Sequence, residues 1–311
     1  GKIFHHRNGR LSDDVSWDIH PDLGQGANSG SKVYKPSNHS EFSPNSTQDF
    51  ENTGDFANAD FVADYIRQDH DKPFFAACGI FRPHLPWYAP REFFDQWEVE
   101  DIDIPIQYLE NDRADCEWGG NNELPEVLAS GLWKDAVRGY LACASFADRC
   151  VGHVLDALEA SGKADSTIIV LAGDHGWHLG DKDHFGKFTV WEQAIETPLI
   201  IYDPTVEGEN GVCRRVVSLQ DIYPTLVELC GLPDTTESGD PVRADAIAGR
   251  SLRPLLEDNE AVWHGAALTS YRWDNHSLRT DRFRYIRTGS GDEELYDHKN
   301  DPWEWGNLAK D

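Results

Sequence analysis

The feature that most constrains this chain is a long amphipathic pattern followed directly by a short β-branched run. Within residues 134–161, apolar side chains recur at spacings of three and four and form one helical stripe: Val137, Leu141, Ala144, Ala147, Val151, Val154 and Leu158. Gly162 follows, where a left-handed residue can end the helix. Residues 166–172 are apolar and β-branched, as a central parallel strand is. Together the two patterns predict a helix that packs on a buried sheet.

Similar patterns indicate two further helices and two further buried strands: residues 57–68 and 221–230, and residues 73–80 and 198–202. Helices that alternate with buried strands favour a parallel sheet with helices on both faces. Beyond about residue 250, three short alternating segments indicate antiparallel pairing: residues 267–271, 277–280 and 283–287. The predicted fold class is α/β, with a mostly parallel sheet flanked by helices and a small C-terminal antiparallel α+β subdomain. The predicted domains are residues 1–250 and residues 251–311.

The chain is strongly acidic. It carries 28 Lys and Arg against 55 Asp and Glu among its 311 residues, a formal charge of −27. This surplus excludes nucleic acid as a partner, because an anionic polymer would be repelled over most of the surface. The longest apolar runs are too short to cross a membrane, so no membrane partner is predicted. Any anionic substrate therefore needs a local cationic pocket.

The six cysteines contain no Cys-x-x-Cys pair, which argues against a zinc ribbon or a thioredoxin-type site. Cys143 and Cys150 are seven residues apart on the predicted long helix, so they share one face. We interpret them as buried small hydrophobic residues, with a disulfide as the alternative.

The strongest local motif is Gly173-Asp174-His175-Gly176, which directly follows the predicted strand at residues 166–172. In open α/β sheets, ligands bind beyond the carboxyl ends of the strands. A carboxylate and an imidazole at this place can hold a cation, because one neutralises charge and the other adds a nitrogen donor. The alternative is a turn aspartate beside an exposed histidine, and the dipeptide alone leaves both interpretations open.

Two further motifs carry candidate functional side chains. Lys187 stands thirteen residues after Asp174, directly behind Gly186, which allows close backbone approach. A single lysine is usually a solvated charge, but behind a metal-binding loop it is a candidate anion ligand. His84 lies between Pro83 and Pro86, which fix the backbone and allow its imidazole to be aimed. The alternative for His84 is a histidine packed in a loop.

A run of arginines follows in the C-terminal region. Arg282 and Arg284 alternate with Phe283 and Tyr285, so a strand would place both charges on one face. We interpret this face as solvated. The alternative is a basic rim that holds an anionic polysaccharide near the site.

Taken together, these motifs resemble the sulfatase family of the alkaline phosphatase superfamily, and within it the iduronate-2-sulfatase-like branch. They run in family order over nearly the whole chain. The matching segments are Gly1-Lys2-Ile3-Phe4-His5, Lys72-Pro73-Phe74-Phe75, Arg82-Pro83-His84-Leu85-Pro86, Gly173-Asp174-His175-Gly176-Trp177, Lys187, Trp191-Glu192, Glu294-Leu295-Tyr296-Asp297 and Asp301-Pro302. The resemblance implies an alkaline-phosphatase-like fold.

The resemblance also implies a metal site. Asp174 and His175 resemble two ligands of the active-site divalent cation, which is usually calcium in this family. Many members have Asn at the second position. Histidine there fits the iduronate-like branch, but it is an unusual ligand for calcium.

Four residues resemble the groups that bind and cleave the sulfate ester. Lys2, His5 and Lys187 resemble the cationic ring that stabilises charge on the sulfate oxygens. His84 resembles the histidine that contacts the bridging oxygen and protonates the leaving alcohol. His5 also resembles a residue that assists the collapse of the enzyme-bound sulfate.

The nucleophile motif of the family is missing from this sequence. Family members carry a Cys or Ser in a C/S-x-P-x-R motif, which is oxidised to formylglycine, and no such motif occurs in the 311 residues. The early Asp pair that completes the metal site is missing too, since Asp13 and Asp14 lie on the wrong side of the Lys2–His5 segment. We expect a C-terminal portion of a sulfatase, with formylglycine in a preceding segment and no activity in this chain alone.

The function implied is a sulfuric ester hydrolase that acts on a sulfated sugar or polysaccharide, in the periplasm or outside the cell. One alternative is a phosphodiesterase or phosphonate monoester hydrolase of the same superfamily, because the same cationic groups suit phosphoryl oxygens. Another alternative is a non-catalytic relic that binds a metal or a sulfated glycan. The sequence leaves open which sugar is the substrate and how the protein oligomerises.

Overall fold

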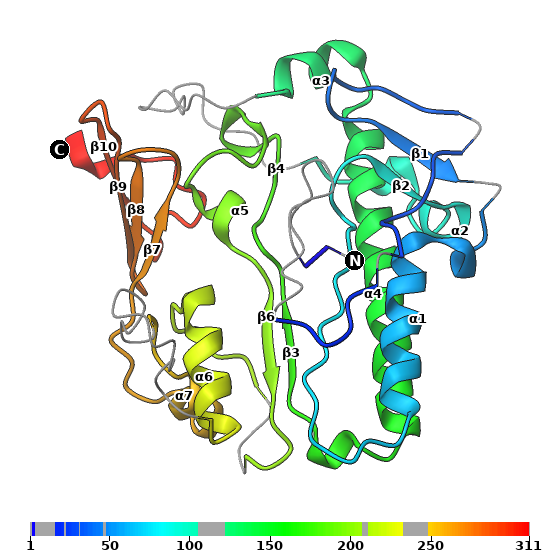
Figure 1. The fold of residues 1–311 in the computed structure, drawn as a ribbon. Helices are drawn as coiled ribbons and strands as arrows, with labels where there is room; N and C mark the ends of the chain where they lie inside the picture. The colour runs from blue at the N-terminus through cyan, green and yellow to red at the C-terminus, as the bar shows by residue number, and fades with distance from the viewer. Residues whose placement is uncertain are drawn as a thin grey trace. The chain divides into compact units, whose positions relative to one another are not determined.

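The computed structural model describes residues 2–3, 16–21, 23–30, 32–45, 48–104, 122–206, 211–232 and 248–310. These residues belong to two compact units (Figure 1). The first unit comprises Gly1–Pro105 and Asn122–Asp165, and the second comprises Ile106–Asn121 and Ser166–Asp311. No helix in the described part of the chain is both long and apolar enough to cross a membrane. The domain boundary at residue 250 stays a prediction.

The first unit is built on two helices that pack along each other, α1 (Gly54–Arg67) and α4 (Trp133–Ala160) (Figure 1). The other elements of this unit are β1 (Phe42–Asn45), β2 (Trp87–Pro90), α2 (Arg91–Phe94) and α3 (Leu124–Ser130). β1 and β2 pair in parallel, with Phe42 opposite Trp87. At the N-terminus of α1, the Thr53 side chain accepts a hydrogen bond from the Phe56 N–H. Both helices predicted here from the sequence are therefore present.

The buried face of α4 differs from the predicted stripe. The fully buried side chains include Ala136, Cys143, Phe146 and Cys150, while most residues of the predicted stripe are only partly buried. The face is rotated because aromatic side chains of neighbouring elements fill the space beside Phe146, which contacts Phe50 and Phe93. Cys143 and Cys150 are free thiols, as their interpretation as buried hydrophobic residues requires.

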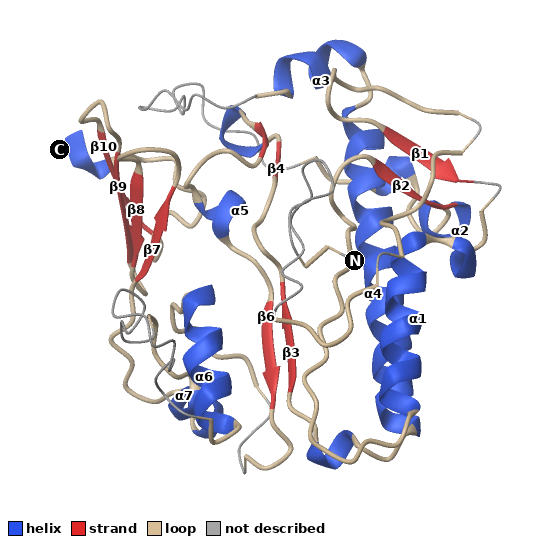
Figure 2. Cartoon of the chain, viewed as in Figure 1, coloured by secondary structure: helices blue, strands red, loops and turns tan. Residues whose placement is uncertain are grey.

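The second unit contains a two-stranded pair, a short hairpin and a four-stranded sheet (Figure 2). Its strands are β3 (Ile169–Ala172), β4 (His178–Leu179), β5 (Phe185–Gly186), β6 (Leu199–Tyr202), β7 (Ala267–Ser270), β8 (His276–Arg279), β9 (Phe283–Arg287) and β10 (Glu293–Asp297). Its α-helices are α5 (Glu192–Ile195), α6 (Ile222–Leu229) and α7 (Arg253–Glu257). Short 3-10 helices in both units span Phe50–Asn52, Val99–Asp101, Ala164–Ser166, Asp181–Asp183, Leu219–Asp221 and Leu308–Lys310.

The C-terminal sheet confirms the predicted antiparallel subdomain. Its strand order is β10-β9-β8-β7, with every neighbouring pair antiparallel. Sequence patterns indicated three of these strands, and β10 was missed because its residues are mostly charged. The sheet packs on a buried cluster of Val190, Trp191, Ile286 and Tyr296.

The prediction of a mostly parallel sheet is wrong for the described residues. β3 and β6 run antiparallel, with Ile169 opposite Tyr202 and Ala172 opposite Leu199. A parallel neighbour needs a full crossover connection, usually a helix. The chain between these strands instead forms the β4–β5 hairpin and the four-residue helix α5. The fold is mixed α/β.

The predicted buried strand at residues 73–80 is also wrong. The segment forms no strand in the structure, and Phe75 is 72% exposed. No strand in the described part of the chain pairs with it. Its backbone instead lies against residues 2–3, since a Cβ atom on Gly79 would stand 2.6 Å from the Lys2 carbonyl carbon.

The arginines of β9 correct a third prediction. Arg284 and Ile286 are fully buried, whereas Phe283 and Tyr285 on the other face are partly exposed. The Arg284 face is therefore not solvated. Arg284 is buried because two carboxylates pair with it, as described below.

Candidate active site

Two glycines fix the loop that carries Asp174 and His175. The Gly173 N–H donates to the Pro198 carbonyl oxygen at 3.0 Å, and the Gly176 N–H donates to the Ala194 carbonyl oxygen at 2.9 Å. A Cβ atom on Gly173 would lie 2.1 Å from Thr197 Oγ1, and one on Gly176 would lie 2.1 Å from the Gln193 carbonyl oxygen. Only glycine allows this close approach. The loop is thus held against residues 193–198 on both sides of the two candidate ligands.

The His175 ring is oriented by hydrogen bonds at both nitrogens. Its Nδ1 lies 2.8 Å from the Gly176 carbonyl oxygen. A carbonyl only accepts, so Nδ1 carries the hydrogen and the neutral ring keeps its lone pair on Nε2. His175 Nε2 lies 2.9 Å from Lys187 Nζ and 3.6 Å from Asp174 Oδ2. The structure therefore brings three predicted site residues together: Asp174, His175 and Lys187.

The donors at this place fit part of a cation site. Ligand atoms bind a divalent cation at about 2.0–2.6 Å. The 3.6 Å between Asp174 Oδ2 and His175 Nε2 is short enough for both atoms to contact one ion. The Asp174 side chain is 72% exposed, so the carboxylate is accessible. Calcium takes six to eight oxygen ligands, whereas imidazole suits transition metals, so these two donors do not fix which metal binds.

Lys187 reaches His175 because the β4–β5 hairpin reverses the chain. His178 stands opposite Gly186 in this hairpin, and Gly186 has a φ of 138°, which favours glycine. The buried His178 side chain bonds through Nδ1 to the Asp181 carboxylate and through Nε2 to Thr189 Oγ1, at 2.8 Å for the latter. These buried bonds hold the segment that carries Lys187.

Two aromatic rings surround the Lys187 ammonium. Lys187 Nζ lies 5.9 Å from the ring centroids of both Trp177 and Phe188. Such cation–π contacts stabilise a charge in a partly apolar setting. Sequence reasoning assigned no role to these two rings, although both directly neighbour the motifs that it singled out.

His184 adds no charge to this region. The ring is 4% exposed, and burial together with the neighbouring His178 lowers its pKa to about 3, against the opposing effect of Asp181. His184 is therefore neutral at physiological pH and adds no positive charge to that of Lys187.

In the first unit, His84 and Lys2 both contact Phe81. The His84 and Phe81 rings are 4.8 Å apart, and Lys2 Nζ lies 5.3 Å from the Phe81 ring centroid. His84 Nδ1 lies 2.6 Å from the Leu85 carbonyl oxygen, so Nδ1 carries the hydrogen. The bonds Arg82–Pro83 and Leu85–Pro86 on either side are both cis.

Arg82 and Asp55 hold the His84 loop in place. The buried Arg82 side chain donates to the Tyr88 carbonyl oxygen at 2.8 Å and to the Ala27 carbonyl oxygen at 3.0 Å. The Asp55 carboxylate, which is fully buried, accepts from the Arg82 N–H at 3.0 Å. His5 lies outside the described residues. The meeting of His84 and Lys2 with Asp174, His175 and Lys187 in one site stays a prediction.

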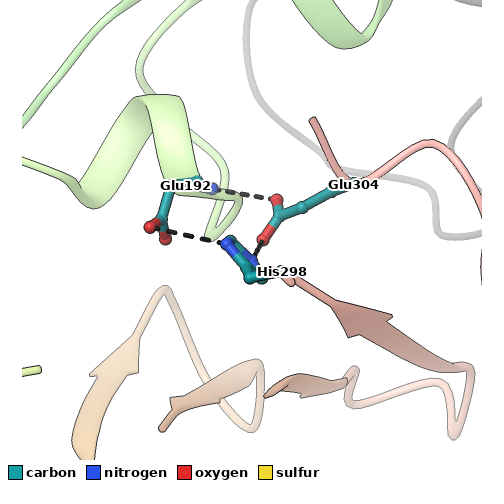
Figure 3. A group of neighbouring side chains, drawn as sticks. All are labelled: Glu192, His298 and Glu304. Atoms are coloured by element: carbon teal, nitrogen blue, oxygen red, sulfur yellow. Dashed lines mark hydrogen bonds and ion pairs between the residues drawn. The ribbon is translucent and has the colours of Figure 1, made fainter. Parts of the chain in front are cut away.

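A second cluster of acidic and histidine side chains lies in the second unit (Figure 3). The Glu192 N–H donates to Glu304 Oε2 at 3.0 Å, and His298 Nε2 lies 2.8 Å from Glu304 Oε1. His298 Nδ1 lies 3.8 Å from Glu192 Oε1. Three such residues at short range have the donor atoms of a metal site.

Two arginines already neutralise this cluster. The Arg284 guanidinium pairs with both Glu192 and Glu304, and Arg279 Nη2 lies 2.9 Å from His298 Nδ1. Burial alone would raise the pKa of Glu304, but Arg284 and His298 outweigh it and hold that pKa below its usual value. A metal ion would have to displace both guanidinium groups. We therefore interpret the cluster as a buried ion-pair network that ties Glu192 to the C-terminal sheet.

Comparison with known proteins adds independent evidence. A family model described as Sulfatase matches residues 21–232, and one described as N-sulphoglucosamine sulphohydrolase, C-terminal, matches residues 173–311. A sulfatase of Formosa agariphila is 38% identical, over 80% of this chain and 48% of its own length. The chain spans about half the length of the curated relatives it matches.

Solved structures agree on the fold. The phosphonate monoester hydrolase of Agrobacterium radiobacter superposes with a TM-score of 0.68 at 22% identity, covering 97% of this chain and 62% of that one. A protein in complex with its substrate D-glucosamine-2-N,6-O-disulfate superposes with a TM-score of 0.63 at 21% identity, covering 81% and 65%. The fold is therefore alkaline-phosphatase-like. Since the Sulfatase model covers more than half of the sequence, the chain belongs to the sulfatase family.

Proposed function

We propose that this chain forms part of a sulfuric ester hydrolase that acts on a sulfated carbohydrate. The observation that carries the proposal is the contact of 2.9 Å between Lys187 Nζ and His175 Nε2, beside the Asp174 carboxylate. It sets an ammonium group next to two candidate cation ligands, and so gathers positive charge in a chain of formal charge −27. A sulfate ester needs such a local cationic pocket.

The proposed metal ligands are Asp174 and His175. The exposed Asp174 carboxylate and His175 Nε2 are the atoms that would hold the divalent cation, and Nε2 would give up its contact with Lys187 Nζ when the ion binds. A bound cation supplies Lewis-acid polarisation of an ester oxygen. Histidine at the second position supports the iduronate-2-sulfatase-like branch, and calcium stays the expected metal for the family.

The proposed anion-binding and proton-transfer residues are Lys187, Lys2, His5 and His84. Lys187, Lys2 and His5 neutralise charge on the sulfate oxygens. His84 protonates the leaving alcohol through Nε2, because its Nδ1 is engaged with the Leu85 carbonyl oxygen. The formylglycine nucleophile belongs to a segment outside this sequence, and the proposed location is the periplasm or the cell exterior.

The carbohydrate substrate class is supported by a structural relative solved with a sulfated glucosamine as its substrate. The fold is also similar to that of a phosphonate monoester hydrolase, so hydrolysis of a phosphonate monoester is the alternative function. The same cation and lysines can bind a sulfate ester or a phosphonate monoester. A comparison of the two as ligands therefore separates the two functions.

Ligand binding to the 311-residue chain tests the proposal. Isothermal titration is carried out with glucosamine 6-sulfate and with the monoester phenyl phenylphosphonate, each with and without added Ca²⁺ or Mn²⁺. The sulfate ester is expected to bind more tightly than the phosphonate monoester, and its binding is expected to depend on the cation. Lys187→Ala is expected to weaken that binding at least tenfold, which corresponds to about 1.4 kcal/mol. Lys35→Ala is the matched control, because Lys35 is an exposed lysine paired with Glu41.

Two outcomes would contradict the proposal. Equal binding of the sulfate ester by wild type and Lys187→Ala would return Lys187 to a solvated surface charge. Preferential binding of phenyl phenylphosphonate would favour the phosphonate ester alternative.

A further inference from the structure

Trp273 is an exposed indole on a well-built turn. It lies between β7 and β8, and 92% of its surface is exposed. Asn275 fixes the turn: its Nδ2 donates to the Tyr271 carbonyl oxygen at 2.9 Å, and its Oδ1 accepts from the Gly289 N–H at 3.1 Å. A large apolar side chain held outward by a fixed backbone is typical of a binding surface.

An aromatic row connects this turn to Lys187 within the second unit. The Phe188 ring lies 5.9 Å from Lys187 Nζ and 6.0 Å from the Tyr271 ring. Tyr271 packs against the buried cluster that includes Trp191 and Ile286, so its position is fixed by the core. Trp273 follows Tyr271 by two residues in the chain and is exposed on the turn at which this row ends.

The charges on the turn suit an anionic ligand. The Arg272 guanidinium carbon lies 5.2 Å from the Tyr271 ring centroid, next to Trp273 in the chain. The Asp274 carboxylate lies 3.5 Å from His276 Nε2, and His276 Nδ1 bonds to Ser270 Oγ at 2.8 Å. The Asp274 carboxylate is therefore paired with His276, while Arg272 places a positive charge beside the Tyr271 ring.

We propose that Trp273, with Tyr271 and Arg272, forms a second carbohydrate subsite for a sulfated glycan. The indole face stacks on the C–H face of a pyranose ring, because an aromatic face carries partial negative charge and sugar C–H groups carry partial positive charge. Arg272 pairs with a sulfate group on the same sugar. The ring bound here is a sugar further along the glycan than the one whose sulfate ester Lys187 contacts. This inference rests on the proposed function.

Length-dependent binding tests the subsite. Dissociation constants of the 311-residue chain are measured for glucosamine 6-sulfate and for a heparin-derived hexasaccharide. Trp273→Ala is expected to weaken hexasaccharide binding about tenfold and to leave monosaccharide binding unchanged. Trp273→Phe is expected to retain most of the affinity, because stacking needs the aromatic face rather than the indole N–H. Trp303→Ala, which removes a less exposed tryptophan outside the turn, serves as the control and is expected to bind like wild type.

Three results would overturn the inference. The first is an unchanged hexasaccharide affinity in Trp273→Ala, and the second is an equal loss for both sugars. The third is a change in sedimentation coefficient without a change in affinity, which would assign Trp273 to self-association. In each case, loss of monosaccharide binding by Lys187→Ala would still support the proposed function. If Lys187→Ala binds both sugars normally, the proposed function fails instead.

Discussion

At the scale of single residues, Lys187 is expected to act on the transition state. Negative charge builds up toward the leaving oxygen as the S–O bond breaks, and a fixed ammonium stabilises that charge more than the charge of the ground state. In the active enzyme that includes this chain, Lys187→Ala is expected to lower kcat about 10²–10³-fold. Steady-state kinetics with an aryl sulfate as substrate measure this change in kcat.

The melting curve of the same variant gives the control. Lys187→Arg is expected to restore activity only in part, because the planar guanidinium is larger and places its charge differently. Normal kcat in Lys187→Ala, or lost activity explained by unfolding, would contradict the role.

Gly176 is expected to be essential for the geometry of the metal loop. In Gly176→Ala, the new Cβ would meet the Gln193 backbone oxygen at 2.1 Å, so the loop or residues 193–196 must shift. We expect a loss of about 1–3 kcal/mol in the free energy of unfolding, measured by urea denaturation. The matched control is Gly152→Ala in α4, where a Cβ meets nothing within 4 Å. That change is expected to stabilise the protein by about 0.5–1 kcal/mol. A Gly176→Ala variant as stable as wild type would show that the contact relaxes freely.

At the scale of secondary-structure elements, Arg284 is expected to hold β9 to the Trp191–Glu192 segment. Arg284→Met leaves the fully buried Glu304 carboxylate and the partly buried Glu192 carboxylate without their main cation. We expect the free energy of unfolding to fall by about 3–5 kcal/mol, since removal of one partner leaves buried charge uncompensated. Arg253→Met, which breaks a pair with Glu257 that is exposed on both sides, is expected to leave stability nearly unchanged. Equal urea midpoints for the two variants would contradict the ion-pair interpretation.

The pH dependence of stability follows from Glu304. Its pKa is lower in the folded chain than its ordinary value of 4.5, because Arg284 and His298 outweigh the effect of burial. The stabilisation is present above pH 4.5 and is lost as the pH falls through the lower folded pKa. The stability difference between wild type and Glu304→Gln is therefore expected to be large at pH 7 and to shrink below pH 4.5. A difference that stays constant with pH would assign the effect to packing rather than charge.

Sequence patterns predicted the elements better than their pairing. α4 and β3 lie within a few residues of the predicted ranges, because helical periodicity and a β-branched run are local signals. The direction of β6 could not be read, since it depends on how residues 173–198 return along β3. The burial of Arg284 escaped prediction because its partners Glu192 and Glu304 are 92 and 20 residues away in the sequence.

The site was predictable in part for a similar reason. Asp174, His175 and Lys187 occur within fourteen residues of sequence, and the structure places them in contact. Trp177 and Phe188 were not assigned a role, because single aromatic residues are far more often part of a core than of a site.

At the scale of the whole molecule, we expect catalysis to need a nucleophile that these 311 residues do not supply. No C/S-x-P-x-R motif occurs in the 311 residues, so we expect no hydrolysis of an aryl sulfate by the purified chain. The Lys187→Ala chain, prepared in parallel, reports contaminating activity. Turnover that is present in wild type and absent from Lys187→Ala would contradict the assignment of the nucleophile to another segment.

The ties between Lys187's segment and the C-terminal sheet also set an order of events during synthesis. The Glu192–Glu304 bond joins residues 112 positions apart, and the Trp191–Glu294 bond joins residues 103 positions apart. Contacts of such sequence separation form late, because the intervening chain must first exist and then close a long loop. The segment at residues 187–192 therefore leaves the ribosome well before its supports at residues 284–304. Until those supports emerge, a nascent chain holds the lysine only by the local bonds of the β4–β5 hairpin, so the cationic pocket matures only after residues 284–304 have been synthesised.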